Sequence, residues 1–259
     1  MGEIHFKERG KGFPLILIHG FCETNEIWDS FAERLSSDFR VITPDLPGFG
    51  KSPLPNKEIS LLGVAATLNN WLHQIEIREC LVIGHSLGGY VTLSMVAQEP
   101  ALIAGFGLFH STTFPDSEEK KQNRNKVFDF VDKNGVLPFV DTFVSGLFYR
   151  QDNPFIEKVH SIASQTRKET LMAYTLAMRD RPDSTSLLTS YEGDSFFLAG
   201  RYDSLIPYSV IEEQSRISRR SVLQILENSG HMGMFEDVET AYKAVQSFGF
   251  KVEDRPVKH

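Results

Sequence analysis

One serine stands in a setting that suits nucleophilic chemistry. The pentapeptide Gly84-His-Ser-Leu-Gly88 lies between an apolar run at 81–83, typical of a strand, and a helical pattern at 90–98. On so sharp a strand-to-helix turn, a side chain at either glycine position would strike the neighbouring strand or helix. The turn would hold the hydroxyl of Ser86 above a sheet. The pentapeptide alone is a weak signal, and its position between a strand and a helix makes it specific.

A nucleophilic serine needs a base, and the base needs a carboxylate that orients it. His231 follows the apolar run 221–226, and Asp203 follows the run 195–199. Either residue by itself is typical of an ordinary loop, as a solvated histidine or as an aspartate in a turn or helix cap. The order Ser86, Asp203, His231, with each residue placed after a strand, predicts a catalytic triad.

Acyl transfer also needs donors for the oxyanion that forms on the attacked carbonyl. Gly20 follows the first central strand, where the chain turns sharply and a backbone N–H can face the serine. We expect the N–H of Phe21 and the N–H of Leu87, at a helix N-terminus, to form this hole. Alternatively, Gly20 serves the tight turn alone; the two interpretations are compatible.

The elements that would position these residues follow from the hydrophobic pattern. Up to about residue 111, short apolar runs alternate with helical patterns, which is typical of parallel strands joined by crossover helices. Runs at 14–19 and 39–43 predict buried strands, residues 4–8 an antiparallel edge strand, and residues 61–75 an amphipathic helix. From about 115 to 183 the pattern is helical throughout. Four short helices are expected there, the first starting at a capping box of Asp116 and Glu119 and stopping at Asn134-Gly135.

Composition excludes several classes of function. The 259 residues are 41% hydrophobic and 24% charged, as in ordinary globular proteins, and the net charge of −7 disfavours nucleic-acid and anionic-membrane partners. Cys22 and Cys80 give no disulfide framework, and no apolar run is long enough to span a bilayer. We therefore expect a cytoplasmic protein that acts on a small molecule, with its oligomeric state left open.

With these residues the chain resembles the α/β-hydrolase family, in its branch of capped serine hydrolases. The matching segments are 17–21, 45–52, 84–89, 200–203 and 230–231, in the family's order. The resemblance implies an α/β fold: a mostly parallel, doubly wound sheet of about eight strands, built from residues 1–114 and 191–259. It also implies an all-helical cap, residues 115–190, inserted after the sixth strand. In this family the acid position corresponds to Asp203, and Asp45 belongs to a structural turn. Some members carry the acid after the sixth strand instead, and at that place this chain has His110.

The resemblance implies a serine hydrolase that cleaves a small or medium, largely apolar carboxylic ester without metal or cofactor. Phe139, Phe143 and Phe148 are the candidate residues for the substrate pocket, although most cap aromatics are expected to pack the cap. Serine at position 86 disfavours the chemistries of relatives with Asp or Cys there. The alternatives are a C–C bond hydrolase, a lactonase or a cofactor-free perhydrolase, and a ligand-binding protein or receptor with slow or no turnover. For His110 and Cys22 packing is favoured, and the sequence predicts no role for His85 or Glu23.

Overall fold

The computed structural model of the protein describes residues 3–56 and 58–255, so the outermost residues of the two expected core segments lie outside it. Within this part, seven strands form one sheet in the order β1-β3-β2-β4-β5-β6-β7. All neighbouring strands are parallel except β1, which runs antiparallel to β3. The strands are β1 (Phe6–Arg9), β2 (Pro14–Ile18), β3 (Arg40–Pro44), β4 (Cys80–His85), β5 (Ile103–Phe109), β6 (Asp194–Gly200) and β7 (Ser221–Leu226).

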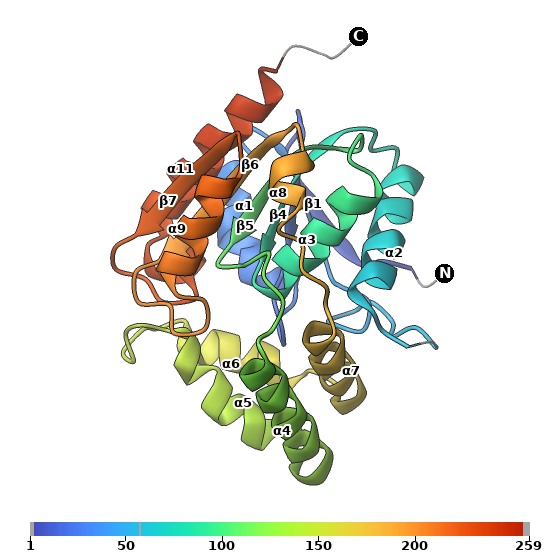
Figure 1. The fold of residues 1–259 in the computed structure, drawn as a ribbon, viewed down its shortest axis with the longest axis vertical. Coiled ribbons are helices and arrows are strands. Elements are labelled where there is room, and N and C mark those ends of the chain that lie inside the picture. Colours follow the sequence, from blue (N-terminus) through green and yellow to red (C-terminus); the bar gives the residue numbers. More distant parts are fainter. Residues whose placement is uncertain (1–2, 57, 256–259) are drawn as a thin grey trace.

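Helices cover both faces of this sheet, which confirms the doubly wound α/β fold. In Figure 1, α3 and α8 lie in front of the sheet and α1 lies behind it. Contacts join α1 to α11, α2 to α3, and α8 to α9. The helices of these layers are η1 (Asn25–Trp28), α1 (Asp29–Leu35), α2 (Leu61–Gln74), α3 (Leu87–Gln98), α8 (Leu187–Ser190), α9 (Tyr208–Ile217), α10 (Gly233–Glu236) and α11 (Val238–Glu253).

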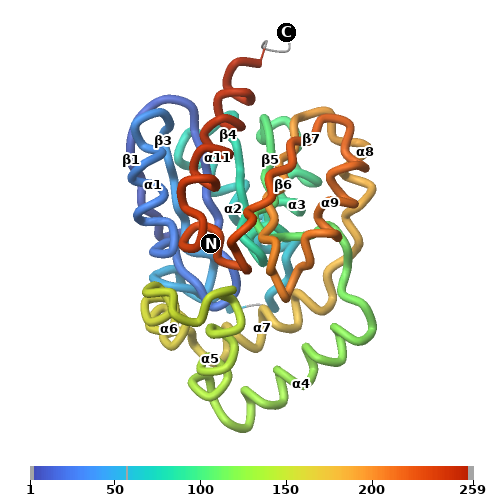
Figure 2. The backbone as a smooth tube through the Cα atoms, turned by 90° about the vertical axis from the view of Figure 1, so that its left-hand side faces the viewer, coloured from blue at the N-terminus to red at the C-terminus, as the bar shows by residue number. Residues whose placement is uncertain are grey.

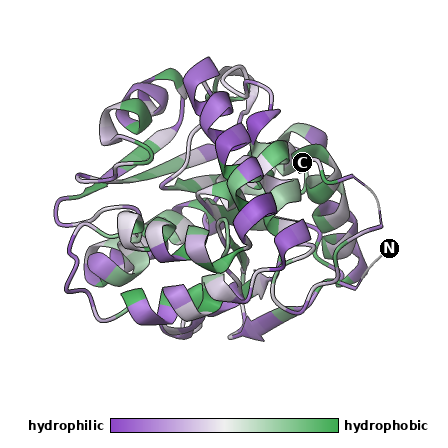
Figure 3. Cartoon of the chain, turned by 90° about the horizontal axis from the view of Figure 1, so that it is seen from below, coloured by the Kyte–Doolittle hydropathy of each residue, from purple (hydrophilic) through white to green (hydrophobic). Residues whose placement is uncertain are grey.

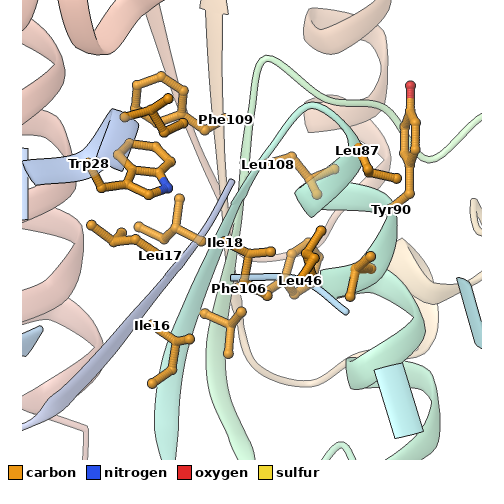
Figure 4. Packing of buried hydrophobic residues seen from close by; sticks show 14 of the residues in the cluster. Ile16, Leu17, Ile18, Trp28, Leu46, Leu87, Tyr90, Phe106, Leu108 and Phe109 are labelled. Carbon is orange, nitrogen blue, oxygen red and sulfur yellow. The ribbon is translucent and has the colours of Figure 1, made fainter. Parts of the chain in front are cut away.

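The core lies on both sides of the central strands. Every residue of β4, β5 and β6 is buried, because apolar side chains alternate toward two helical layers that both exclude water. Figure 3 shows hydrophobic colouring on the central strands and mixed colouring on the helices around them. On one face the ring of Trp28 packs edge-on against Phe109, 5.4 Å between centroids, as Figure 4 illustrates. This packing fixes the ends of β4 and β5, where the candidate site lies.

The segment between β5 and β6 is helical, as its periodicity predicts. It contains α4 (Glu118–Asn134), α5 (Leu137–Phe143), η2 (Ser145–Leu147), α6 (Ile156–Ser164) and α7 (Lys168–Arg179). Figures 1 and 2 place α4 to α7 together beyond the carboxyl ends of the strands. The short helix α8 belongs to the sheet layers instead, where it contacts α9.

Two details of the fold differ from expectation. The cap of α4 is Ser117, whose Oγ accepts from the N–H of Lys120, and not Asp116, whose carboxylate binds Arg124 and Arg181. The sheet of the described residues has seven strands where about eight are expected, because the segment before Pro14 forms one short strand. The helical insertion therefore follows the fifth strand along the chain. In the described part no helix is both long and apolar enough to cross a membrane.

Candidate active site

Ser86 sits on the sharp turn between β4 and α3. Its backbone has φ 50° and ψ −115°, a conformation that costs a non-glycine residue about 1–3 kcal/mol and recurs at functional sites. Hydrogen bonds hold it there: the N–H of Ser86 donates to the carbonyl of Phe109 (3.0 Å), and Ser111 Oγ donates to the carbonyl of Ser86 (2.7 Å). Ser86 is partly exposed while its neighbours from Cys80 to Val91 are buried. The turn therefore presents this one side chain at the sheet edge.

The two glycines of the pentapeptide are needed for backbone contact. A Cβ on Gly88 would lie 2.6 Å from the carbonyl oxygens of both Ile18 and His19, which belong to the neighbouring strand and its end. A Cβ on Gly84 would collide with the backbone of Gly88 itself. Since these obstacles are main-chain atoms, they cannot rotate away. The two glycines are therefore required because α3 packs closely against the backbone of β2 and β4.

Asp203 and His231 form a buried pair at the same edge. The loop after β6 carries Asp203 and the loop after β7 carries His231, and His231 Nδ1 lies 2.7 Å from Asp203 Oδ2. Their exposed fractions are 6% and 2%. The carbonyl of His231 lies 2.9 Å from Nε2 of His85, the residue that precedes Ser86. The imidazole of His231 is therefore held next to the serine turn, with Nδ1 engaged by the carboxylate.

The carboxylate of Asp203 is surrounded by donors. Its Oδ1 accepts from the N–H groups of Leu205 (2.9 Å) and Ile206 (3.0 Å), at the start of the turn that leads into α9. Burial raises the pKa of Asp203, but the charge of His231 and hydrogen bonds from His110 and His231 outweigh burial and hold this pKa well below its usual range. Asp203 is thus an anion fit to orient an imidazole and to stabilise its cation.

His110 also contacts the carboxylate of Asp203, and this contact is not predicted from the sequence. His110 Nδ1 lies 3.2 Å from both Asp203 Oδ2 and the nitrogen of Gly200, and its Nε2 accepts from the N–H of Gly233 (3.2 Å). Burial lowers the pKa of His110 to about 4, so the ring is neutral. Because Nε2 accepts from Gly233, the single ring proton is on Nδ1 and is donated to the carboxylate. The one signal for this arrangement is that His110 directly follows strand β5, beside β6 in the sheet. The role it supports is packing and hydrogen bonding around Asp203.

The expected oxyanion donors also lie at this edge. Leu87 is the first residue of α3, and Phe21 follows β2; their side chains are buried. Neither N–H donates to an acceptor within the part of the chain that the structure describes. A buried N–H without an acceptor is rare, and at a site of acyl transfer it is the donor that an oxyanion uses. The assignment of these two N–H groups stays a prediction.

Two of the three phenylalanine rings expected to line a pocket lie against the loop after β2. Phe139 and Phe143 of α5 are stacked, 5.0 Å between centroids, and contact the ring of Phe21 at 6.3 and 5.9 Å. Both are partly buried, whereas Phe148 is only 4% exposed. The structure therefore separates the three candidates: two face the loop that holds Phe21, and Phe148 packs in the interior.

The loop of His231 is tied to the helical insertion. The N–H of His231 donates to the carbonyl of Leu147 (2.8 Å), and Glu236 accepts from the N–H groups of Tyr149 (2.7 Å) and Gly230 (2.9 Å). A Cβ on Gly230 would lie 2.7 Å from the nitrogen of Tyr149, so this contact is close. The segment after α5 thus lies directly against the candidate base.

Other acidic and thiol groups named by the sequence have structural partners. Asp45 accepts from the N–H groups of Asn25 (2.8 Å) and Lys51 (3.0 Å) and bonds His5, as a structural turn would. Cys22 is buried, and burial raises the pKa of its thiol, which leaves it protonated. These contacts favour a structural turn for Asp45 and packing for Cys22.

One group of side chains in the described residues has the ligand types and the spacing to hold a metal ion. It consists of His110, Asp203 and His231, whose ligand atoms lie within 4.8 Å of one another. Both Nδ1 atoms already lie within hydrogen-bonding distance of Asp203 Oδ2, and Nε2 of His110 faces the N–H of Gly233. The donor set is thus already occupied by internal hydrogen bonds, which fits an oriented imidazole better than a metal centre.

Comparison with known proteins places this geometry in a family. The model of the alpha/beta hydrolase fold family matches residues 14–238. A solved structure of a thermophilic esterase from Thermogutta terrifontis, with malate bound, is 29% identical and has a TM-score of 0.92, covering 97% of this chain and 94% of its own. An esterase from Exiguobacterium antarcticum has a TM-score of 0.89 over 96% of both chains, and at 19% identity it shows the fold alone.

Several curated relatives match over shorter stretches. An uncharacterized protein of Mycobacterium bovis is 34% identical over 98 residues, which are 38% of this chain and 29% of the relative. A pimeloyl-[acyl-carrier protein] methyl ester esterase of Legionella pneumophila is 33% identical over 100 residues, 39% of this chain and 38% of the relative. These two matches span only 29% and 38% of the relatives' lengths. The family model, in contrast, covers well over half of the 259 residues, and the chain therefore belongs to the α/β-hydrolase fold family.

Proposed function

We propose that the protein is a serine hydrolase that cleaves small or medium, largely apolar carboxylic esters, with Ser86 as nucleophile, His231 as base and Asp203 as the carboxylate that orients the base. The observation that carries this proposal is the buried pair of His231 Nδ1 and Asp203 Oδ2, 2.7 Å apart, beside a serine held at positive φ on the turn between β4 and α3. A loop histidine without function has no need of a buried carboxylate.

The chemistry follows from which nitrogen is engaged. Because Asp203 holds Nδ1–H of His231, the lone pair on Nε2 is the one available to take the proton of Ser86. As this proton leaves, Ser86 Oγ bonds to the ester carbonyl carbon, and the N–H groups of Phe21 and Leu87 donate hydrogen bonds to the oxyanion. The imidazolium then gives its proton to the departing alcohol. Water, activated by the same nitrogen, cleaves the acyl-enzyme and restores the hydroxyl.

The substrate class rests on the apolar rings near this site. Phe139 and Phe143 reach the ring of Phe21 from α5, so an acyl or alcohol group bound beside Phe21 would contact these aromatic faces. We further propose that the helices α4 to α7 act as a cap over the serine. The 29% identical relative named an esterase supports ester chemistry.

No specific observation favours another reaction. A bromoperoxidase from Bacillus anthracis and an enol-lactonase from Burkholderia xenovorans superpose well, at TM-scores of 0.87, but are 20% and 17% identical, so they show the fold alone. A receptor without turnover would have no use for a strained serine beside an oriented imidazole. The proposal therefore stays with ester hydrolysis.

Turnover of p-nitrophenyl esters of graded acyl length tests the proposal. We expect hydrolysis by the wild type and by Ser94→Ala, which alters a partly buried serine on the same helix α3 whose Oγ donates to the carbonyl of Tyr90. Ser86→Ala should lose hydrolysis by orders of magnitude while keeping its fold, because the change removes one partly exposed hydroxyl. If Ser86→Ala kept turnover within about tenfold of the wild type, Ser86 would not be the nucleophile.

A further inference from the structure

A second acid–imidazole pair lies beside the triad and takes no part in the proposed mechanism. Glu23 follows the loop of Phe21, and His85 is the last residue of β4. Glu23 Oε2 lies 3.0 Å from His85 Nδ1, and their exposed side-chain fractions are 2% and 0%. Rings of Trp28 and Phe109 stand edge-on to the imidazole of His85 at 6.3 and 6.1 Å. Two ionisable groups so deeply buried are costly unless each is fully partnered.

Both ring nitrogens of His85 face acceptors. Nδ1 faces the carboxylate of Glu23, and Nε2 faces the carbonyl oxygen of His231 at 2.9 Å. A neutral imidazole has one N–H and can donate to one of them only, so satisfying both requires a proton on each nitrogen. The contacts of the ring thus fit an imidazolium paired with a carboxylate.

The electrostatics agree with this proton count. Burial lowers the pKa of His85, but the charge of Glu23, its hydrogen bond and the carbonyl of His231 outweigh burial and raise this pKa above its usual value. Burial likewise raises the pKa of Glu23, and the charge of His85 reverses this and brings the pKa below its usual value. Other titratable groups near His85 among the described residues include Asp203, whose charge also favours the cation, and His110 and His231, whose rings lie 6.0 and 4.9 Å away. His19 also interacts electrostatically with both His85 and Glu23; burial lowers the pKa of His19, which keeps its ring from competing for the carboxylate as a cation.

The pair connects three separate parts of the candidate site. Glu23 Oε2 also accepts from the N–H of Gly20 (2.5 Å), which belongs to the loop that carries Phe21. His85 precedes Ser86 on the turn, and its Nε2 holds the backbone of His231. A Cβ on Gly20 would lie 2.8 Å from both Glu23 Oε2 and His85 Nδ1, so the glycine leaves room for this contact. One continuous chain of hydrogen bonds therefore runs from the oxyanion loop to the base loop.

We propose that Glu23 and His85 are positioning residues: a buried carboxylate–imidazolium pair that holds the Phe21 loop and the His231 loop in register around Ser86. This inference rests on the proposed ester hydrolysis. Neither residue touches the reacting atoms, so both would act through Gly20 and His231. The proposal accounts for two polar residues whose presence the triad alone does not explain.

The variant Glu23→Gln tests the charge at nearly constant shape. A single oxygen, Oε2, takes both the N–H of Gly20 and the N–H of His85. Glutamine can place its carbonyl there but carries no charge, so the buried imidazolium loses its counter-ion and the ring releases a proton. If Nε2 is the atom that loses it, a lone pair then faces the carbonyl of His231, and the loop of the base shifts.

We expect Glu23→Gln and His85→Gln to lower kcat on p-nitrophenyl esters by about 10- to 1000-fold with KM within about threefold, because orientation of the base and of the oxyanion donors is a transition-state property. The double variant should be little worse than either single variant, since both changes break one chain. A matched control is the surface pair His73 and Glu99, 2.6 Å apart and half exposed. Glu99→Gln and His73→Gln should leave kcat and KM unchanged.

A second measurement needs neither activity nor a variant. Long-range proton–nitrogen NMR of the wild type at pH 8 should show both nitrogens of His85 protonated, with the ring resonances assigned by through-bond correlation to the backbone of His85 in the wild type itself. A neutral ring at pH 8 would overturn the proposal even if the variants fail to fold. So would folded, fluorophosphonate-reactive Glu23→Gln and His85→Gln proteins with kcat within threefold of the surface controls. If the wild type itself neither hydrolyses esters nor reacts with the probe, the proposed function has failed. A protonated His85 would then show that the ion pair exists, and the positioning role in catalysis would be overturned together with the function.

Discussion

At the scale of single residues, the carboxylate of Asp203 is the side chain whose replacement should change the site most. It receives four donors, two of them imidazoles, and its pKa lies below the usual range because these donors outweigh burial. An amide in its place offers one acceptor oxygen and presents an N–H group where an imidazole N–H must bond. In the proposed mechanism, the orientation and the charge of His231 both depend on this one side chain.

We therefore expect Asp203→Asn to lower kcat at neutral pH by about three to four orders of magnitude, because the amide favours the wrong tautomer of His231 and cannot stabilise its cation. Esterase assays at pH 7 to 8 measure the effect, with the exposed Asp129 as control through Asp129→Asn. A nearly silent Asp203→Asn together with a crippling Asp45→Asn or Asp116→Asn would show that the acid is elsewhere.

His110 makes stability depend on pH. Its pKa falls from the ordinary 6.5 to about 4 in the folded state, mainly because it is buried. Between these values the unfolded chain binds a proton that the folded chain does not, so this stability is full above about pH 6.5 and is lost as pH falls toward 4. At about 1.4 kcal/mol per pKa unit the loss amounts to roughly 3 kcal/mol.

The comparison with His110→Asn isolates this contribution. Asparagine tolerates the positive φ of 51° at this position and keeps an amide donor toward Asp203, yet it does not titrate. Unfolding free energies measured in denaturant from pH 4 to 7 should fall less steeply for the variant than for the wild type. Parallel curves would mean that the imidazole is not held neutral in the folded protein.

At the scale of elements, the turn between β4 and α3 depends on main-chain contact. A Cβ on Gly88 would lie 2.6 Å from two carbonyl oxygens of the β2 end, which obliges α3 to move away from the sheet. Gly88→Ala should lower the free energy of unfolding by about 1–3 kcal/mol or more and reduce esterase activity, because the helix carries the N–H of Leu87. Melting curves and activity assays check both effects. Gly146→Ala is the control, since a Cβ there meets nothing within 4 Å.

The side chains of α5 are expected to set the preference for acyl-chain length. Phe139 and Phe143 are partly buried and contact the ring of Phe21, whereas Phe148 is 4% exposed. Phe139→Ala or Phe143→Ala should shift preference toward longer acyl chains with modest loss of stability, while Phe148→Ala should cost about 3–5 kcal/mol. Chain-length profiles and melting curves distinguish the two outcomes. If none of the three changed the profile, the pocket would lie elsewhere.

For the whole molecule, the periodicity of the sequence was enough to predict the sheet, its antiparallel edge strand and the helical insertion. The run Leu61 to Ile75 became α2, ending at Gln74, and Asn134-Gly135 ended α4, with Gly135 at φ 82°. Such signals are local: a repeat of apolar residues or a glycine at a helix end acts within a few turns. The three residues of the proposed triad were chosen by the same means, since each directly follows a strand or lies in the loop after one, and their role stays a prediction.

Other parts of the site depend on contacts between distant segments, which no local pattern encodes. Glu23 and His85 are 62 residues apart, and His85 meets a carbonyl 146 residues further on. His110 meets Asp203 because β5 and β6 are neighbours in the sheet although the whole insertion separates them in sequence. Asp116 suits a helix cap by type, but two arginines, Arg124 and Arg181, bind its carboxylate more strongly than a backbone N–H would. Tertiary partners decide these roles.

The central claim is that the fold brings Ser86, His231 and Asp203, from three separate loops, together into one activated nucleophile. Labelling by a fluorophosphonate probe, followed by peptide mapping in the mass spectrometer, tests this claim most directly. The wild type and Ser94→Ala should each take one label, located on Ser86, whereas Ser86→Ala and the denatured wild type should take none. No label on the folded wild type, a label on another residue, or labelling that persists in Ser86→Ala would contradict the account.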